Sequence, residues 1–455
     1  MSADLPAPTG SEPPGGAPTA AAPRPRATGG AAWRATGLPQ AAGLIGLAAR
    51  LGWLRLRGGP ERPAAEAHTI ADTLGRLKGP FAKVGQLLSL RVDLASPELR
   101  EALAGLRDNV PPLPLETVRG VVEAELGAPL ETLFSRFDAM PLGAASIAQV
   151  HRAVTRDGAD VVVKVQYPWL RHSLPADLWV LRMALFLSGT LRQRGSLFDE
   201  FRDNINEELD FEREARVAGE IAANLGDEAG IVVPRTVPGL STPRVLTMAW
   251  HPAFPIHDGA ALDARQVPRE ELVTTLVRAY ARQIFVDGLF HADPHPGNLF
   301  VVDEPAASTA PRILFIDFGL SKRLSPTLRR ELRLGIYALL QGRTDDFIAG
   351  MHRLEMIRPG AEPGVRAALG KIFGQLEAEA GGSALGLSGD RVLGLKDRAK
   401  ELLFETPGLT LPVELLLYAR TLSYLFALAN EVAPEIDVMK LTVPYLLRFL
   451  AGRDD

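Results

Sequence analysis

Cysteine is absent from the 455-residue sequence. This excludes disulfide bonds and thiolate metal sites, so a hard, oxygen-bound metal is the only kind that the sequence favours. Long uncharged apolar runs are missing too. The most apolar stretches lie near 44–54 and 415–428, and each contains an arginine, Arg50 or Arg420. The sequence therefore predicts no membrane-spanning helix.

Two further absences narrow the function classes. The first residues, Met1–Asp4, lack the basic start and apolar core of a secretory signal, so none is expected. An excess of positive charge is lacking as well, because the formal net charge is −4 at pH 7. That balance argues against broad electrostatic binding of nucleic acid.

Large apolar residues are scarce in residues 1–35, which are rich in Ala, Pro, Gly and Thr. Such a segment cannot bury enough surface to offset its ordering entropy, which predicts a disordered tail. The following stretch, Gln40–Leu56, is apolar and helix-prone, and basic residues outnumber acidic ones around it. Two interpretations stay open: a helix that packs on the domain, or a basic amphipathic helix on an anionic membrane surface.

The chain does contain two motifs typical of phosphoryl transfer. Phe290–Phe300 has the spacing H-x-D-x-x-x-x-N, with Asp293 and Asn298 five residues apart, and the strand-like run from Ile313 ends in D-F-G at Asp317. One carboxylate can orient the attacking hydroxyl or water. Asn298 and the second carboxylate can hold Mg²⁺ on the phosphates. The alternative is a loop whose Asp and Asn only cap turns.

A lysine-bearing strand precedes these motifs. Pro141–Ala153 is a small-residue loop that enters a strand, and Val161–Gln166 is a β-branched strand with Lys164 as its lone charge. A lysine there either blunts a sheet edge or binds phosphate. The order of loop, hairpin and lysine matches a kinase N-lobe. Gly143 is the loop's only glycine, so this loop should be stiffer than a glycine-rich one.

Several segments are predicted to be helical. Residues 64–110 have helical periodicity, and Lys83 within them would by itself be a solvated surface residue. Ala176–Arg192 is a predicted helical insertion. Asp199–Leu225 is predicted to be one long acidic helix, in which a kinase N-lobe needs one glutamate to pair with the strand lysine. Pro268–Gly288 is predicted to be a helix leading into the catalytic loop.

The remaining elements complete a kinase-like order. Val245–Met248 is predicted to be the last N-lobe strand, with 249–252 as the hinge. Only Leu320–Ser325 separate D-F-G from a new helix at Pro326, which leaves no room for a long activation segment.

Together these residues resemble the UbiB (AarF) family of atypical protein-kinase-like proteins, over roughly residues 65–435. The most diagnostic elements are the K-x-G-Q of Lys83–Gln86, the alanine-rich loop Ala144–His151 and the E-x-D of Glu208–Asp210. The resemblance implies an α+β, bilobal protein-kinase-like fold with an N-terminal helical extension packed over the active site.

The expected domain organisation follows from the same resemblance. It has four parts: a disordered tail and possible amphipathic helix at 1–60, the helical extension with K-x-G-Q at 61–135, the kinase-like N-lobe with its helical insertion at 136–250, and the helical C-lobe at 251–455.

The resemblance also implies residue roles. Lys164 should pair with Glu214 and touch the nucleotide phosphates, while Asn298 and Asp317 hold Mg²⁺ and Asp293 serves as base or water-orienting group. The further residues expected at the catalytic site are Lys83, Gln86, Glu208 and Asp210, with Lys83 near Glu208. The residues expected at the nucleotide are Ala144, Ala145, Ser146, Ile147, Ala148, Gln149, Lys164 and Met248.

The function that this resemblance implies is that of a Mg²⁺-dependent, ATP-binding atypical kinase or ATPase. It would use ATP or ADP and Mg²⁺ and support quinone (ubiquinone-like) biosynthesis or lipid-related regulation. An anionic lipid surface and a quinone precursor are the candidate partners, and the expected location is cytoplasmic or peripheral on the inner membrane. Two residues depart from the expected pattern: Ala292 replaces the usual arginine, and Ala249 replaces an acid at the hinge.

Two other function classes stay open. A small-molecule phosphotransferase shares the pattern H-x-D-x-H-x-x-N, although Lys83–Gln86 and the alanine-rich loop speak against it. A non-catalytic nucleotide- or lipid-binding scaffold is disfavoured because every catalytic position is occupied.

Overall fold

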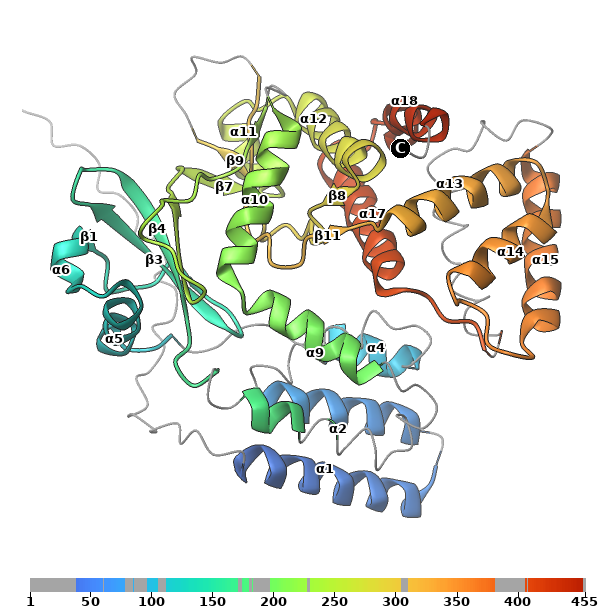
Figure 1. Ribbon diagram of the computed structural model, residues 1–455, viewed down its shortest axis with the longest axis horizontal. Helices are drawn as coiled ribbons and strands as arrows, with labels where there is room; N and C mark the ends of the chain where they lie inside the picture. The colour runs from blue at the N-terminus through green and yellow to red at the C-terminus, as the bar shows by residue number, and fades with distance from the viewer. Residues whose placement is uncertain are drawn as a thin grey trace, which may run out of the picture. The chain divides into compact units, whose positions relative to one another are not determined.

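The N-terminal part of the chain folds into helices that pack on one another. Helix α1 (Leu38–Arg57) packs on α2 (Arg62–Leu77), and α2 packs on α4 (Pro97–Ala104). Figure 1 shows these three helices in blue and cyan. The apolar side chains of α2 recur at helical spacing, and Ala67, Ala71 and Leu74 are buried. The helix expected over Gln40–Leu56 is thus present as α1.

The structure is a computed structural model. The residues that it describes are 38–59, 61–77, 85, 96–104, 112–170, 174–179, 182, 197–226, 230–303, 310–380, 406 and 408–452. The predicted tail at 1–35 lies outside these ranges, as do Lys83, Gln86 and most of the predicted insertion at 176–192. Within these ranges no helix combines the length and apolar character needed to cross a membrane.

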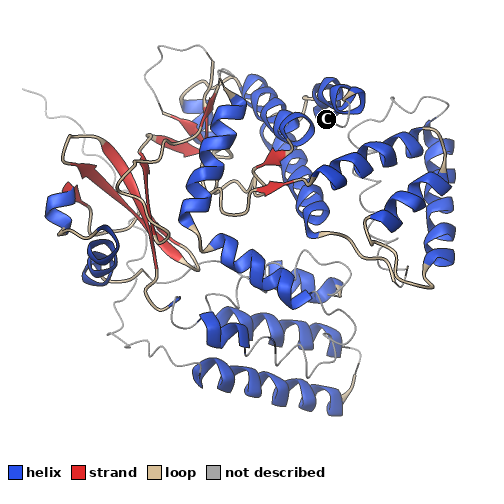
Figure 2. Cartoon of the chain, in the orientation of Figure 1, coloured by secondary structure: helices blue, strands red, loops and turns tan. Residues whose placement is uncertain are grey.

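An antiparallel sheet forms the N-lobe, drawn in red in Figure 2. Its strands are β1 (Phe134–Phe137), β2 (Gly143–Ala144), β3 (Ala148–Thr155), β4 (Asp160–Gln166) and β6 (Val245–Ala249). They run in the order β1-β3-β4-β6, with β2 on β3.

One face of this sheet is apolar. Along β4, Val161, Val163 and Val165 are buried while Lys164 points to the other face, as the alternation predicted. The valines pack on α5 (Leu115–Leu126), and α6 (Leu130–Leu133) leads into β1. Sheet and helix therefore share one core.

The prediction of one long helix over Asp199–Leu225 is wrong. The segment forms α9 (Leu197–Glu208) and α10 (Phe211–Leu225), and Asp210 between them accepts a hydrogen bond from the Arg213 amide as N-cap. An aspartate is a preferred N-cap because its carboxylate satisfies an unpaired N–H of the first turn. The main chain at the break is satisfied elsewhere: the Phe211 amide donates to the Pro243 carbonyl.

The C-lobe is mainly helical and carries small sheets. Its helices are α11 (Gly259–Ala264), α12 (Arg269–Ala281), α13 (Pro326–Leu340), α14 (Thr344–Arg353), α15 (Glu362–Ala380), α17 (Val413–Val432) and α18 (Val438–Ala451). Its strands are β7 (Ala253–Pro255), β8 (Leu289–Phe290), β9 (Leu299–Val302), β10 (Ile313–Phe315) and β11 (Lys322–Arg323). The short strand β5 (Ile231–Val232) runs parallel to β10.

The helix predicted over Pro268–Gly288 changes its winding. It is α-helical to Ala281, continues as a π-helical turn, η1 (Arg282–Asp287), and ends at Gly288, whose φ is 65°. The π turn is followed directly by β8, which pairs with β11. Catalytic loop and D-F-G are thus placed by short strands on either side: β8 and β9 flank the loop, and β10 and β11 flank D-F-G.

Candidate nucleotide and metal site

A cavity of about 270 Å³ lies between the alanine-rich loop and the D-F-G segment. The residues lining it include Ala144 to Ala148 on one side and Lys164, Glu214, Asp317 and Gly319 on the other. They come from β2, β3, β4, α10 and the turn after β10. Segments far apart in sequence therefore meet at one opening.

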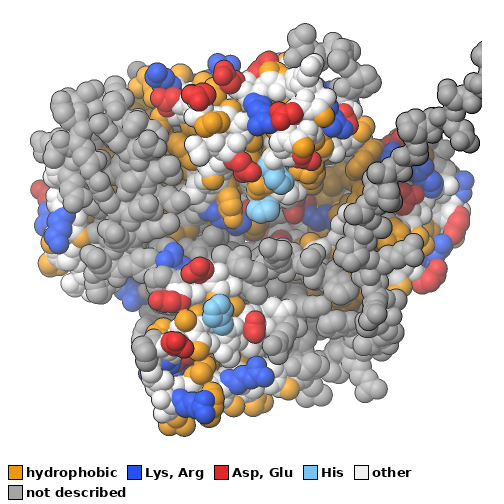
Figure 3. Space-filling view, turned by 180° about the vertical axis from the view of Figure 1, so that it is seen from behind, with side chains coloured by type: hydrophobic (Ala, Val, Ile, Leu, Met, Phe, Trp, Pro, Cys, Tyr) orange, Lys and Arg blue, Asp and Glu red, His pale blue; other side chains and the backbone are white. Residues whose placement is uncertain are grey.

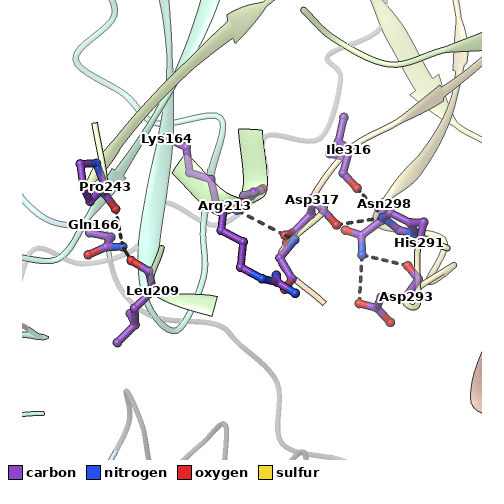
Figure 4. Close-up of polar contacts among 12 residues, drawn as sticks. Lys164, Gln166, Leu209, Arg213, Pro243, His291, Asp293, Asn298, Ile316 and Asp317 are labelled. Atoms are coloured by element: carbon purple, nitrogen blue, oxygen red, sulfur yellow. Dashed lines mark hydrogen bonds and ion pairs between the residues drawn. The ribbon is translucent and has the colours of Figure 1, made fainter. Parts of the chain in front are cut away.

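Lys164 is the centre of the polar side of this cavity. Its Nζ lies 2.9 Å from both carboxylate oxygens of Glu214 and 3.3 Å from Oδ1 of Asp317. Glu214 is only 2% exposed, whereas the Asp317 side chain is 51% exposed and faces the opening. Figure 4 shows Lys164 and Asp317 facing each other across this site.

Burial and charge act against each other in this cluster. Burial by itself lowers the pKa of Lys164, but Asp317 and Glu214 outweigh that effect and raise its pKa above the ordinary value. Burial raises the pKa of the Glu214 carboxyl, and the attraction of Lys164 offsets part of that rise. The lysine thus stays a cation while it faces two carboxylates.

Asp317 is held in an unusual backbone conformation. Its φ is 62°, in the left-handed region that costs most residues about 1–3 kcal/mol. His291 Nε2 lies 2.9 Å from the Asp317 carbonyl oxygen and 3.0 Å from that of Ile316. Two carbonyl acceptors require a proton on Nε2, so Nδ1 accepts from the Tyr280 hydroxyl, 3.0 Å away. Burial raises the pKa of Tyr280 well above its usual range, which keeps that hydroxyl a donor.

Asn298 and Asp293 contact each other in the catalytic loop. Asn298 Nδ2 donates to the Asp293 carbonyl (3.1 Å) and to its Oδ2 (3.0 Å). Because Nδ2 is used in this way, the amide oxygen is the atom left for a metal. The Ile316 amide donates to the Asn298 carbonyl at 3.0 Å, which sets Asn298 beside Asp317. The second Asp293 oxygen, Oδ1, accepts from Arg420 Nη2 at 2.8 Å.

The alanine-rich loop contributes both main chain and one buried hydroxyl. None of residues 143–148 adopts a positive φ, so the loop does not need the conformational freedom of glycine. Ser146 is 3% exposed and lines the cavity, and its Oγ has no hydrogen-bond partner in the described part of the chain. An unpaired buried hydroxyl at an opening is the kind of atom that a ligand can satisfy.

Two residues expected at the nucleotide do not line the cavity. Gln149 is 1% exposed; its Oε1 accepts from the Leu113 amide and its Nε2 donates to the Leu113 carbonyl. Met248 is 8% exposed and packs in the apolar cluster behind the loop, with Ile147 and Leu246. Gln149 is thus bound to Leu113, and Met248 belongs to the apolar core next to the loop.

The E-x-D motif is divided between two places. Glu208, the last residue of α9, lines the cavity, and its Cγ would lie 3.7 Å from a Cβ added at Gly319. Asp210 caps α10 instead. Lys83 and Gln86, the expected partners of Glu208, lie outside the described residues, although Gly85 between them is buried.

Three contributors to the site were not predicted from sequence. They are Tyr280, Arg213 and Arg420. Arg213 donates to the carbonyls of Gly319 (3.4 Å) and Ser321 (3.2 Å), just after D-F-G. Only Arg420 had a visible signal, as a charge inside an apolar helix.

Comparison with known proteins gives the family. The family model of the ABC1 atypical kinase-like domain matches residues 105–349. A probable protein kinase UbiB of Xylella fastidiosa (strain M23) is 32% identical over 424 residues, covering 88% of this chain and 74% of that protein. The Arabidopsis thaliana chloroplastic protein ACTIVITY OF BC1 COMPLEX KINASE 8 is 36% identical over 301 residues.

The matched lengths differ among these proteins. The alignment with the Arabidopsis protein covers 64% of this chain but only 39% of that protein. The solved structure of the Rv3197–erythromycin complex from Mycobacterium tuberculosis has a TM-score of 0.52 and 24% identity, and covers 92% of this chain and all of that one. That likeness supports the mixed helix-and-sheet, kinase-like fold. As its UbiB-like motifs predicted, the chain belongs to the ABC1 atypical kinase-like family.

Proposed function

We propose that this protein binds an adenine nucleotide with Mg²⁺ and acts as an atypical kinase or ATPase. The observation that carries the proposal is the meeting of Lys164, Glu214 and Asp317 at a cavity whose opposite wall is the alanine-rich loop. One lysine faces two carboxylates there, so a divalent cation beside Asp317 would balance the charge. The buried Ser146 hydroxyl adds a group that a ligand would satisfy.

Each residue has a role in this proposal. Lys164 contacts the nucleotide phosphates, the loop main chain covers them, and Asn298 and Asp317 are the protein ligands of Mg²⁺. Magnesium typically takes one or two protein oxygens together with phosphates and water, which fits this small donor set. In the described residues no cluster of three or more His, Cys, Asp or Glu could hold a metal alone. Asp293 orients the attacking hydroxyl or water.

The proposal extends to base recognition and to the covering extension. With Ala249 at the hinge, adenine would be recognised by main-chain groups. Lys83 and Gln86 would approach Glu208 across the opening and restrict access to large acceptors. A double-mutant cycle on nucleotide affinity with Lys83→Ala and Glu208→Ala tests the pairing of Lys83 with Glu208. Purely additive effects would indicate that the two residues do not interact and that Lys83 is a solvated surface residue.

The biological context is proposed from the family. We propose a role in quinone biosynthesis or lipid-related regulation, with the protein cytoplasmic or peripheral on the inner membrane. The four-part domain division is also a proposal. Packing of α5 on the sheet favours moving the boundary between extension and N-lobe from 135 toward residue 112.

Calorimetry with MgADP tests the nucleotide assignment. Asp317→Asn removes the charge, while asparagine tolerates the left-handed backbone, so the fold should be retained. We expect the affinity for MgADP to fall at least tenfold, and EDTA to have the same effect on the wild type. Asp303→Asn, which removes an exposed carboxylate paired with Arg265, is the matched control. Equal binding by wild type and Asp317→Asn would refute the role of Asp317.

The alternative functions make different predictions. A small-molecule phosphotransferase would show ATP consumption that rises strongly with a hydroxylated sugar or amine. A scaffold would bind MgADP without releasing phosphate under any condition. Phosphate release with Mg²⁺ and ATP, measured with and without anionic vesicles and phenolic quinone precursors, separates these outcomes from the kinase or ATPase.

A further inference from the structure

The carboxylate of Asp293 is held from two parts of the chain. Its Oδ2 accepts from Asn298 Nδ2 at 3.0 Å, within the catalytic loop. Its Oδ1 accepts from Arg420 Nη2 at 2.8 Å, from helix α17, 127 residues away in sequence. The two side chains of this ion pair are only 18% and 22% exposed, so water screens their attraction less than at a surface.

The catalytic loop does not supply a cation of this kind itself. Residues 290–300 contain neither lysine nor arginine. Arg420 is the sole basic residue of α17, whose neighbouring residues Leu416, Leu417 and Leu425 are buried. A guanidinium in such a helix loses hydration, and an ion pair with good geometry offsets that loss. Asp293 is its partner.

Arg420 is also restrained from a second side. Its guanidinium carbon lies 5.2 Å from the centre of the Tyr424 ring, one turn further along α17. The Tyr424 ring in turn meets His295 of the catalytic loop edge-on, with ring centres 6.0 Å apart. A third side chain of α17, Tyr418, meets the Phe290 ring edge-on. Helix α17 therefore contacts the loop at several points, and the planar guanidinium has a defined orientation.

We infer that Arg420 is a positioning residue that fixes the Asp293 carboxylate for the reaction. The inference rests on the proposed function. A carboxylate that orients a nucleophile has to keep one rotamer, and a charge-assisted hydrogen bond from arginine to one of its oxygens restrains that rotamer. Arg420 lies outside residues 105–349, which the family model matches.

Arg420 contributes to the phosphoryl-transfer step. With water as acceptor, the bond from the water oxygen to the γ-phosphorus forms while the bond from that phosphorus to the β–γ bridging oxygen breaks. ADP leaves with the bridging oxygen, and the water proton passes to Asp293 and then to solvent or to phosphate. Arg420 acts through Asp293, whose Oδ1 accepts its hydrogen bond at 2.8 Å.

The test compares ground-state and transition-state binding in the full-length chain. Affinities for MgADP alone and for MgADP with aluminium fluoride are measured by calorimetry, together with phosphate release from MgATP. The variants are Arg420→Gln, Arg420→Lys, Asp293→Asn and the Arg420→Gln/Asp293→Asn double variant. Glu431→Gln, which removes an exposed charge from the same helix, is the matched control.

We expect Arg420→Gln to bind MgADP within twofold of the wild type. Its binding of the aluminium fluoride complex and its kcat should both fall by about 100-fold, the size of effect that misplacement by about 1 Å has. KM should change little, because the loss is confined to the transition state. Arg420→Lys should recover part of the lost kcat and of the lost affinity for the aluminium fluoride complex, and Glu431→Gln should match the wild type. In the Asp293→Asn background, Arg420→Gln should cause no further loss.

Other results would overturn the inference. Arg420→Gln with wild-type kcat and wild-type affinity for the aluminium fluoride complex excludes positioning of Asp293. An equal loss of MgADP affinity indicates a structural or nucleotide-binding role, and additive effects with Asp293→Asn exclude action through that residue. A wild-type chain that binds MgADP but gains no affinity from aluminium fluoride also refutes it. A wild-type chain that does not bind MgADP refutes the proposed function itself, and this inference with it.

Discussion

Nε2 of His291 lies 2.9 Å from the carbonyl oxygen of Asp317, whose φ is 62°. The imidazole is 1% exposed and bridges two main-chain carbonyls and the Tyr280 hydroxyl. It therefore stabilises a backbone that residues other than glycine rarely adopt. This contact restrains the main chain that carries the Asp317 carboxylate.

The first prediction follows from that contact. His291→Leu should lower the free energy of unfolding by about 1–3 kcal/mol, because it leaves buried polar groups without partners. Affinity for MgADP should fall by about tenfold as the Asp317 main chain relaxes. Denaturant unfolding and calorimetry measure the two effects. The exposed His257→Leu is the control, and unchanged nucleotide affinity in His291→Leu would contradict the prediction.

A second prediction concerns Arg213, which ties α10 to the segment after D-F-G. Besides the carbonyls of Gly319 and Ser321, it contacts Glu207 at 3.1 Å. These contacts join α10 to the short segment that follows D-F-G. Arg213→Met should speed amide hydrogen exchange in residues 319–323 by at least tenfold.

Arg216→Met is the matched control for this experiment. Arg216 is on the same helix, is 67% exposed and contacts Asp210 only at 3.7 Å, so its loss should leave exchange unchanged. Equal exchange in all three proteins would mean that Arg213 does not order the segment.

The third prediction is a pH dependence centred on His151. This histidine is fully buried; Nδ1 contacts the Asp138 carbonyl at 2.8 Å, and Nε2 contacts the Gln149 amide nitrogen at 2.7 Å. Nδ1 therefore carries the proton and Nε2 accepts. Burial lowers the pKa of His151, and the contact with Asp138 only partly opposes this.

The sign follows from proton uptake. Because the folded pKa lies below the unfolded value of about 6.5, the unfolded chain binds the extra proton first. The contribution of His151 to stability is complete above about pH 6.5 and is lost as the pH falls toward the folded pKa, by at most about 1.4 kcal/mol per pH unit. Unfolding between pH 7.5 and 5 should show this slope. This pH dependence of the free energy of unfolding should persist in the control variant His68→Asn, which changes an exposed histidine, and should diminish in His151→Asn. An unchanged pH dependence in His151→Asn would mean that another group causes it.

The fourth prediction concerns the outer face of α1. Ile45 (70% exposed), Trp53 (51%) and Leu56 (89%) lie within one half of the circumference of this helix. The Arg57 guanidinium lies over the Trp53 ring, and the first turn of the helix has no acid. Figure 3 shows hydrophobic and basic side chains next to one another along the lower edge, where α1 lies. Such a surface suits anionic vesicles, with binding that weakens as salt rises.

Replacing Ile45, Trp53 and Leu56 by serine should reduce co-sedimentation with anionic vesicles at least fivefold. Leu447→Ser removes an exposed leucine from α18 and is the control. If the triple variant bound the vesicles as well as the wild type, and salt had no effect on binding, α1 would not be the lipid-binding surface.

The sequence alone determined those parts of the site that depend on local spacing. The interval from Asp293 to Asn298 is short enough to fold into one loop, where the two side chains contact each other. The alternation along β4 set the face of Lys164, because side chains of a strand point to opposite sides. The family motifs could be recognised from sequence for the same reason, because each is a short run of residues with a fixed local spacing.

Only the tertiary structure decided which distant groups meet. A short break at Asp210 turned one predicted helix into two, because an N-cap and the Pro243 carbonyl compensated for the interruption. Gln149 does not line the cavity because Leu113 binds both ends of its amide. Arg420 met Asp293 across 127 residues. Pairings of this kind depend on the packing of whole elements, which local residue preferences do not encode.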